Sequence, residues 1–188
     1  MRYITLATGH RTYFDRAIAL ARYLTEAGHW MEIHTGPYPG SKRQACYQKA
    51  FLCHQQIQQG PLIFIDADST ISGDPPLPEL TELSGYDLAV VPKGLSHLPF
   101  EAGLLFFNDT PAARHLLELW ARRCRAGWEN PQAEADHRIL CGLWKENQLQ
   151  TGWLDKRLFS TGSNPPEESH IRIGRSDREI SHRHHRAS

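Results

Sequence analysis

Short apolar runs alternate with amphipathic stretches in the first 65 residues of the chain. Residues 3–7 and 30–35 are typical of β-strands, and the continuous apolar run 62–65 is typical of a strand that is covered on both faces. Thr12 and Ser41 precede two of the amphipathic stretches and can cap helices there. This alternation of strands and helices predicts a doubly wound parallel sheet.

The apolar positions of the two early helices recur at helical spacing and are expected to face the core. They are Ala17, Ile18, Ala21 and Leu24 in the first helix, and Cys46, Ala50, Cys53 and Ile57 in the second.

The second half of the chain has a less regular pattern. Residues 86–91 and 103–107 are predicted to be strands. The pair Thr110-Pro111 predicts the start of a helix that ends near Gly127, because proline is favoured at the first helical position. A further helix is expected over 133–146, followed by short strands, loops and a basic tail.

Composition places few limits on function but excludes several classes. The 188 residues fit one globular domain, and no apolar run approaches the roughly 20 residues of a membrane span. The 21 basic and 21 acidic residues balance, so net charge gives no argument for binding nucleic acid or anionic membranes. Four cysteines without a CxxC pair predict reduced thiols in a cytoplasmic protein.

An acidic pair follows the apolar run 62–65. Asp66 and Asp68 stand two positions apart, so an extended backbone projects both to the same side. Two carboxylates this close are costly unless a cation lies between them, and oxygen ligands suit Mg²⁺ or Mn²⁺. The pair therefore predicts metal or phosphate chemistry at the carboxyl end of a strand, where open α/β sheets bind ligands. An exposed turn is the alternative.

Two enzyme families place such a pair after a buried strand. The segment 66–70 resembles the nucleophile motif of haloacid-dehalogenase-like phosphatases, which would make Asp66 the nucleophile and Asp68 the acid/base of a magnesium-dependent phosphatase. In that family the motif normally ends the first strand, whereas here a β-α-β-α unit precedes it. No downstream acidic pair of the expected pattern follows.

The second resemblance extends over more of the chain. Lys49 precedes the Asp-Ala-Asp motif on a helix, residues 101–108 form a Glu-Ala-Gly step before an apolar run and Asn, and Asp136-His137 opens a later helix. In this order the elements resemble glycosyltransferases of the GT-A fold, of the glycogenin-like or nucleotide-diphospho-sugar transferase type. The resemblance implies one compact, Rossmann-like α/β domain over 1–175, with a mainly parallel central sheet flanked by helices. A basic His/Arg-rich tail would occupy 176–188.

The resemblance implies a metal-dependent transfer of a sugar from a nucleotide diphosphate, with UDP as the expected nucleotide, to an acceptor hydroxyl with retention of configuration. The implied residues are Glu101, Asp136 and His137 for catalysis, Asp66, Asp68 and His170 for Mn²⁺ or Mg²⁺, and Thr8, Gly9, His10, Tyr13, Lys49, Asp66, Ala67, Asp68, Arg172 and Arg175 for the donor. Glu101 and His137 depart from the Asn and Gln that relatives often carry. A surface role for each is the alternative.

Several points stay open at the level of sequence. The third metal ligand is taken as His170, but His182, His184 and His185 are alternatives. The tail arginines could contact the diphosphate, an anionic acceptor or only solvent. The acceptor could be a saccharide, a protein, a small molecule or a hydroxylated nucleobase. A nucleotide-sugar-binding module without transfer activity is a further alternative.

Overall fold

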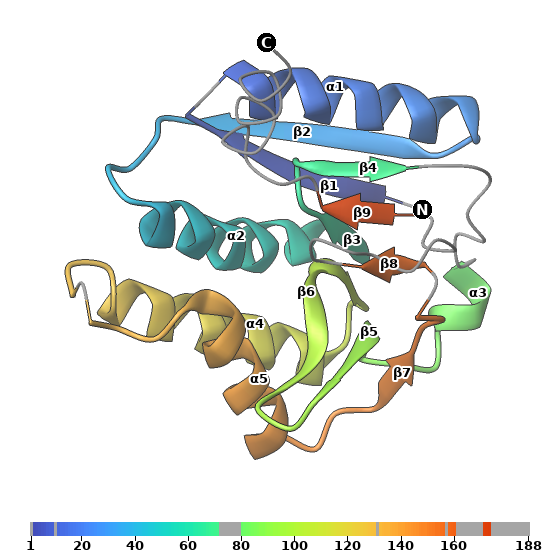
Figure 1. The fold of residues 1–188 in the computed structure, drawn as a ribbon. Helices are drawn as coiled ribbons and strands as arrows, with labels where there is room; N and C mark the ends of the chain where they lie inside the picture. Colours follow the sequence, from blue (N-terminus) through green and yellow to red (C-terminus); the bar gives the residue numbers. More distant parts are fainter. Residues whose placement is uncertain are drawn as a thin grey trace, which may run out of the picture.

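The computed structural model describes residues 2–9, 11–71, 80–130, 132–156, 158–160 and 171–173 (Figure 1). The elements in chain order are β1 (Arg2–Thr8), α1 (Arg11–Glu26), β2 (Trp30–Gly36), α2 (Lys42–Gln56), the 3-10 helix η1 (Ile57–Gln59), β3 (Leu62–Ile65), β4 (Ser69–Ile71), α3 (Leu80–Leu83), β5 (Leu88–Leu95), β6 (Leu98–Phe107), α4 (Pro111–Ala126), α5 (Asp136–Glu146), β7 (Thr151–Trp153), β8 (Phe159–Ser160) and β9 (Ile171–Ile173).

The central sheet has six strands in the order β2-β1-β3-β6-β5-β7. β1 is parallel to β2 and β3, and β5 is parallel to β7, whereas β6 is antiparallel to both of its neighbours. The expectation of a mainly parallel sheet in an α/β domain is confirmed. The exception is β6, because only two residues separate it from β5 and so short a connection forms a hairpin, which is antiparallel.

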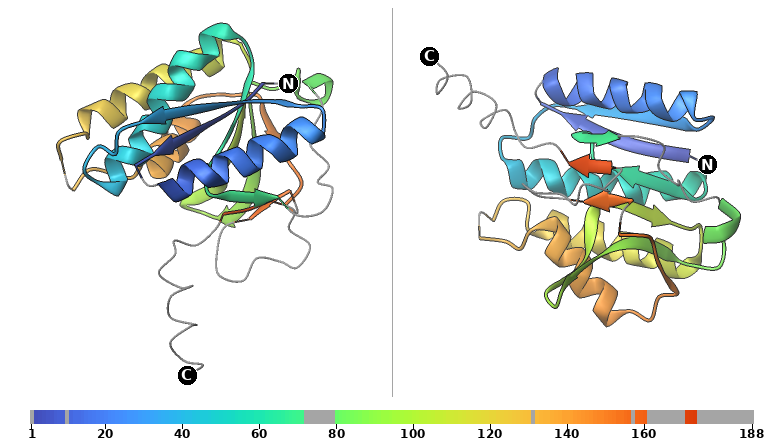
Figure 2. Two further views of the ribbon diagram at one scale, coloured as in Figure 1. Left: turned by 90° about the horizontal axis from the view of Figure 1, so that it is seen from above. Right: turned by 45° about the vertical axis from the view of Figure 1, so that its right-hand side comes forward.

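Helices cover both faces of this sheet. Alternate side chains of β3 point to opposite faces: Leu62 and Phe64 pack in a core with α2, α4 and α5, and Ile63 and Ile65 pack in a core with α1. Figure 2 shows α2 and α4 together on one side of the sheet and α1 on the other. The apolar run that the sequence predicted as a two-sided strand is buried along its whole length.

A second, smaller sheet has the order β4-β9-β8. β4 follows the acidic motif directly and contacts α1, so the small sheet lies on the α1 side of the central sheet (Figure 1). β9 is its middle strand, antiparallel to β4 and parallel to β8. The C-terminal part of the described chain is thereby joined to the segment that follows Asp66 and Asp68.

Two predicted helix starts are confirmed by their capping hydrogen bonds. The Ser41 side chain accepts from the backbone N–H of Gln44, and the Thr110 side chain accepts from that of Ala113, with Pro111 in the first turn. Thr12 does not cap α1, because the helix begins at Arg11. α5 begins at Asp136, three residues later than expected.

The predicted apolar stripe of α1 is wrong at one position. Ile18 is 39% exposed, and Leu20 is buried in its place with Ala17 and Leu24. The spacing of 17, 20 and 24 follows one helix face, whereas Ile18 is rotated by about 100° from Ala17. In α2, Cys46 is only half-buried, although Ala50 and Cys53 are buried as expected, as is Ile57 at the start of η1.

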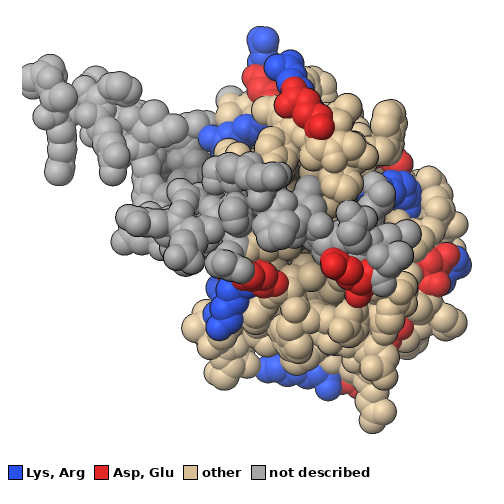
Figure 3. Space-filling model, turned by 90° about the vertical axis from the view of Figure 1, so that its right-hand side faces the viewer, with Lys and Arg blue, Asp and Glu red and all other residues tan. Residues whose placement is uncertain are grey.

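The described surface carries no dominant charge of one sign on the face shown in Figure 3, where Lys and Arg are interspersed with Asp and Glu. All four cysteines are free, as the sequence predicted. Within the described ranges, no helix combines the length and the apolar character that crossing a bilayer requires.

Candidate active site

The candidate site lies at the edge of the sheet where β1 and β3 end and β6 begins. Asp66 follows β3, and its backbone N–H donates to the carbonyl of Gly103 on β6 at 2.9 Å. The Thr5 hydroxyl of β1 donates to the carbonyl of Ile65 at 2.6 Å. These two hydrogen bonds hold the end of β3 from both sides, so the Asp66 side chain projects from a fixed backbone.

Lys49 of α2 joins three elements at this edge. Its ammonium group lies 2.8 Å from Asp66 Oδ1 and 3.9 Å from Asp136 Oδ2, and it donates to the carbonyl of Ala102 at 2.9 Å. It also lies over the ring of Phe64, 5.0 Å from the ring centroid. Burial opposes the charged form, but Asp66 and then Asp136 outweigh burial and raise the pKa of Lys49 above its ordinary value.

Asp136 and His137 open α5 beside this lysine. Asp136 is 7% exposed, and its backbone carbonyl accepts from the indole N–H of Trp120 at 2.9 Å. His137 Nε2 lies 2.7 Å from the carbonyl of Phe100, so Nε2 carries the proton and donates. Burial lowers the pKa of His137, which favours the neutral ring with Nδ1 unprotonated. Substrate contact by this ring would therefore use Nδ1.

Glu101 lies on β6 between two residues that hold this site together. Its neighbour Phe100 accepts from His137, and its neighbour Ala102 accepts from Lys49. Glu101 is 7% exposed and forms an ion pair with Lys93 of β5, with 3.0 Å between Nζ and Oε2. The alternative that Glu101 is a solvated strand-edge acid is therefore wrong.

Asp68 occupies a different environment from Asp66. Burial, and next the charge of Asp66, raises the pKa of the Asp68 carboxyl to about 6. Contrary to the sequence prediction, the backbone is not extended here but turns at Ala67 and Asp68, where the N–H of Ser69 donates to the carbonyl of Asp66 at 3.0 Å. Carboxylate oxygens are the ligands that Mg²⁺ and Mn²⁺ prefer, so the chemistry of this donor pair is compatible with a metal. Within the described residues no group of three or more His, Cys, Asp or Glu side chains is placed to hold a metal ion. His170, the predicted third ligand, lies outside the described residues.

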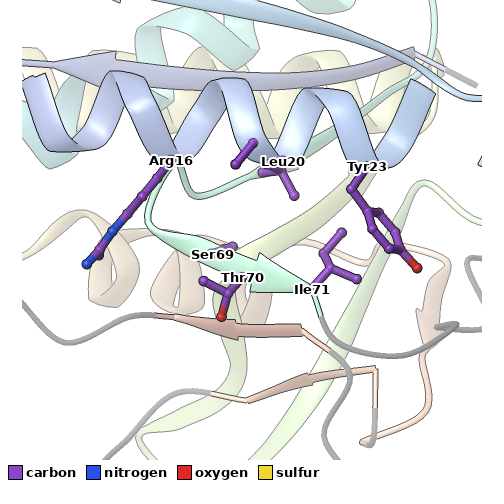
Figure 4. A pocket seen from close by; sticks show the side chains of 7 residues that line it. Arg16, Leu20, Tyr23, Ser69, Thr70 and Ile71 are labelled. Atoms are coloured by element: carbon purple, nitrogen blue, oxygen red, sulfur yellow. The ribbon is translucent and has the colours of Figure 1, made fainter. Parts of the chain in front are cut away.

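A cavity of about 250 Å³ lies on the other side of the acidic motif, between α1 and β4 (Figure 4). Arg16 and Tyr23 extend from α1 toward β4 at its two ends. Its wall includes Ser69, whose buried hydroxyl has no hydrogen-bond partner within the described structure.

The predicted nucleotide-side residues lie where β1 ends. Gly9 has φ of +83°, and a Cβ atom there would come within 2.8 Å of the Tyr38 side chain, so glycine is required on both grounds. Tyr38 lies after β2 and is 52% exposed. Thr8 ends β1 opposite Gly36, and Tyr13 is half-exposed in the first turn of α1. His10 lies outside the described residues.

The structure thus brings together the side chains of Asp66, Lys49 and Asp136. His137 follows Asp136, and Glu101 stands between two residues whose carbonyls contact the site, while its own side chain pairs with Lys93. Ala67 and Asp68 continue the motif, and Ala67 packs with Ala7 and Ala17. Arg172 lies on β9, where its backbone pairs with Thr70, and Arg175 is outside the described residues.

Sequence reasoning missed three residues at or near this edge. They are Lys93, Tyr38 and Cys46, whose thiol pKa is raised to about 11 by burial first and by Asp136 next. No motif marks any of them. Only the i, i+3 spacing of Cys46 and Lys49 on one helix could have indicated that they share a face.

Comparison with known proteins gives a clear result for the fold. No protein-family model matches the sequence, and no curated protein is detectably similar to it in sequence. Among solved structures, a glycosyltransferase involved in glycosylation of the major capsid of PBCV-1 superposes with a TM-score of 0.71 at 10% identity, covering 98% of both chains.

Two further structures agree. The galactosyltransferase LgtC, solved with donor and acceptor sugar analogues, gives a TM-score of 0.53 at 11% identity over 92% of this chain and 86% of its own. The glycosyltransferase GlyE of Streptococcus pneumoniae TIGR4 gives 0.50 at 18% identity over 85% of this chain and 47% of its own. The chain therefore has the fold of GT-A-type glycosyltransferases, as its sequence predicted.

Proposed function

We propose that the protein is a metal-dependent glycosyltransferase, which transfers a sugar from a nucleotide-diphosphate sugar to an acceptor hydroxyl. The observation that carries the proposal is the contact of Lys49 with Asp66 and Asp136, beside Asp68, at the sheet edge where open α/β sheets bind ligands. A fold shared with glycosyltransferases supports it. LgtC was solved with donor and acceptor analogues, and we extend donor binding to this chain.

The residues can be assigned roles by their positions. Asp66 and Asp68 would hold Mn²⁺ or Mg²⁺, which when bound supplies positive charge to the leaving diphosphate. Lys49 holds Asp66 in place and adds a second positive charge to the same edge. Tyr38, which packs closely on Gly9 and remains 52% exposed, offers an aromatic face for the nucleotide base.

Asp136 and Glu101 provide carboxylate oxygens for sugar hydroxyls. Both are at least nine-tenths buried and both have a lysine within 4 Å, so their orientations are fixed before substrate arrives. UDP as the nucleotide and retention of configuration, with His170 and the tail arginines as further donor contacts, are parts of this proposal that rest on the sequence resemblance.

Calorimetric titration of UDP tests the proposal. We expect 1 mM Mn²⁺ to tighten UDP binding by at least tenfold in wild type and by less than twofold in Asp68→Asn. Asp15→Asn is the matched control, because Asp15 lies on the surface of α1, and this variant should behave as wild type. If Mn²⁺ leaves the affinity for UDP unchanged in wild type as well as in Asp68→Asn, the metal role of Asp66 and Asp68 is refuted.

The same preparations distinguish the alternatives. Mn²⁺-dependent release of UDP from a UDP-sugar supports the transferase. Release of phosphate from p-nitrophenyl phosphate, lost in Asp66→Asn, would instead support the phosphatase interpretation. Donor binding without turnover of any acceptor would support a binding module.

A further inference from the structure

Lys49 is shared by two acids that lie on different elements. Its ammonium nitrogen lies 2.8 Å from Asp66 Oδ1 and 3.9 Å from Asp136 Oδ2. Asp66 follows β3 and belongs to the acidic motif, whereas Asp136 opens α5. The shorter distance is that of a hydrogen bond, and the longer one is that of an ion pair alone. The ammonium group is therefore shared unequally, with Asp66 as its nearer partner.

The ammonium group of a lysine has three N–H donors and stands on a flexible four-carbon stem. One donor of Lys49 reaches Asp66, and another donates to the carbonyl of Ala102 at 2.9 Å. A hydrogen bond to Asp136 needs a separation of about 2.9 Å, so a shift of about 1 Å from the present 3.9 Å is enough to form it. Lys49 can therefore change acids while it keeps its bond to Ala102.

The charges of these residues favour such a change when a divalent cation binds at Asp66 and Asp68. Burial opposes the charge of Lys49, but Asp66 and then Asp136 raise the pKa of Lys49 above its ordinary value, so the ammonium group stays charged. A second positive charge a few ångströms away repels this group where water is largely excluded. Asp136 is 7% exposed, and a carboxylate this buried gains from a closer positive charge.

We infer that Asp136 is a positioning residue for the metal site, which takes over the ammonium group of Lys49 when a divalent cation neutralises Asp66 and Asp68. The inference rests on the proposed function, because it needs a cation at these two carboxylates. The carbonyl of Ala102 serves as the fixed acceptor about which the ammonium group turns from one acid to the other. Asp136 thereby sets the affinity for the metal without being one of its ligands.

The test measures metal affinity rather than turnover. Mn²⁺ is titrated at a fixed concentration of UDP, and free Mn²⁺ is followed by its electron paramagnetic resonance signal. Asp136→Asn should weaken Mn²⁺ binding at least fivefold, because the ammonium group then stays on Asp66. Lys49→Met should bind Mn²⁺ at least as tightly as wild type. In the Lys49→Met background, Asp136→Asn should change the affinity by less than twofold, since the residue through which it acts is gone.

Glu134→Gln is the matched control. Glu134 carries the same charge two positions before Asp136 but is exposed, so this variant should bind Mn²⁺ within twofold of wild type. Because Lys49→Met weakens the fold, a crystal structure of the wild-type protein with Mg²⁺ and UDP supplies a second measurement. We expect Lys49 Nζ within about 3 Å of an Asp136 oxygen and more than about 4 Å from Asp66. An ammonium group still hydrogen-bonded to Asp66 beside bound Mg²⁺ would overturn the inference.

The outcomes separate this inference from the proposed function. Mn²⁺ binding by wild type that is unchanged in Asp136→Asn would overturn the inference alone. An equal loss on Asp136→Asn with and without Lys49 would also overturn it, because Asp136 would then attract the cation directly. If Mn²⁺ binds no more tightly to wild type than to Asp68→Asn, the proposed metal role fails, and this inference with it.

Discussion

At the scale of residues, Tyr38 is an exposed aromatic side chain that follows β2 and packs on Gly9. It packs so closely over Gly9 that a Cβ atom at that position would lie 2.8 Å from the ring's Cδ2 atom. Tyr38 is 52% exposed as a residue, at the edge where β1 and β2 end. An aromatic face next to a glycine backbone is suited to stack on a planar base.

We therefore predict that Tyr38→Ala weakens UDP binding by about tenfold, since stacking on a base is worth about 1–3 kcal/mol. Tyr38→Phe keeps the ring and should bind within twofold of wild type. Trp30→Ala serves as the control, because Trp30 is even more exposed but lies at the opposite end of β2. Calorimetric titration of UDP measures all three variants. Equal losses in Tyr38→Ala and Trp30→Ala would contradict the assignment.

At the scale of elements, the ammonium group of Lys49 links α2 to the strands and the helix that form the site. Lys49 contacts Asp66 after β3, Asp136 at the start of α5 and the carbonyl of Ala102 on β6. Helix, strand and hairpin thus share a single buried cation. This arrangement fixes the relative positions of the site residues. It also makes the stability of the fold depend strongly on Lys49.

Lys49→Met should consequently destabilise the fold by about 3–5 kcal/mol, the usual cost of removing one partner from a buried ion pair. The reason is that Asp66 and Asp136 would lose their shared counter-charge while Asp136 stays buried. Lys42→Met on the exposed face of the same helix is expected to change stability by less than about 0.5 kcal/mol. Urea unfolding followed by circular dichroism gives both values. A small effect at Lys49 would show that water compensates the two acids.

The sequence allowed elements with strong local signals to be predicted. The caps Ser41 and Thr110 and the two-sided strand β3 follow from residue type and spacing, and all three are confirmed. The reversed direction of β6 was not predicted, because the strands expected from the sequence ended at 91 and began again at 103, whereas β5 extends to Leu95 and β6 begins at Leu98, so that a hairpin joins them. The acidic motif could be recognised in the sequence because its two aspartates, Asp66 and Asp68, stand only two positions apart.

The residues that complete the site could not be found in this way. Lys93 pairs with Glu101 across a bulged hairpin, and the bulge shifts the register so that regular strand pairing does not predict the contact. Tyr38 and Gly9 meet because β1 and β2 are parallel neighbours that end together. Such contacts arise from tertiary packing, which a single sequence does not encode as a pattern.

At the scale of the whole molecule, the C-terminal part of the described chain belongs to the fold. β9 is the middle strand of the small sheet and pairs with both β4 and β8. Because β4 directly follows Asp66 and Asp68, β9 supports the segment that carries the acidic motif. We propose that the domain boundary lies at residue 175, after this strand, and that 176–188 is a separate basic tail.

Two truncations test this boundary. Ending the chain after residue 175 removes the tail but keeps β9, so the thermal midpoint should stay within about 2 °C of wild type, as expected for a loss of less than 1 kcal/mol in a chain of this size. Ending it after residue 166 removes β9, leaves β4 and β8 without their shared partner and should lower the midpoint well beyond that range. If Arg172 and Arg175 contact the diphosphate, the longer deletion also weakens UDP binding in Mn²⁺, because charge-assisted contacts are lost, whereas the shorter deletion keeps both residues and should not. Unchanged donor binding combined with impaired transfer would place the tail at an anionic acceptor instead, and no change in either would leave it a solvated extension.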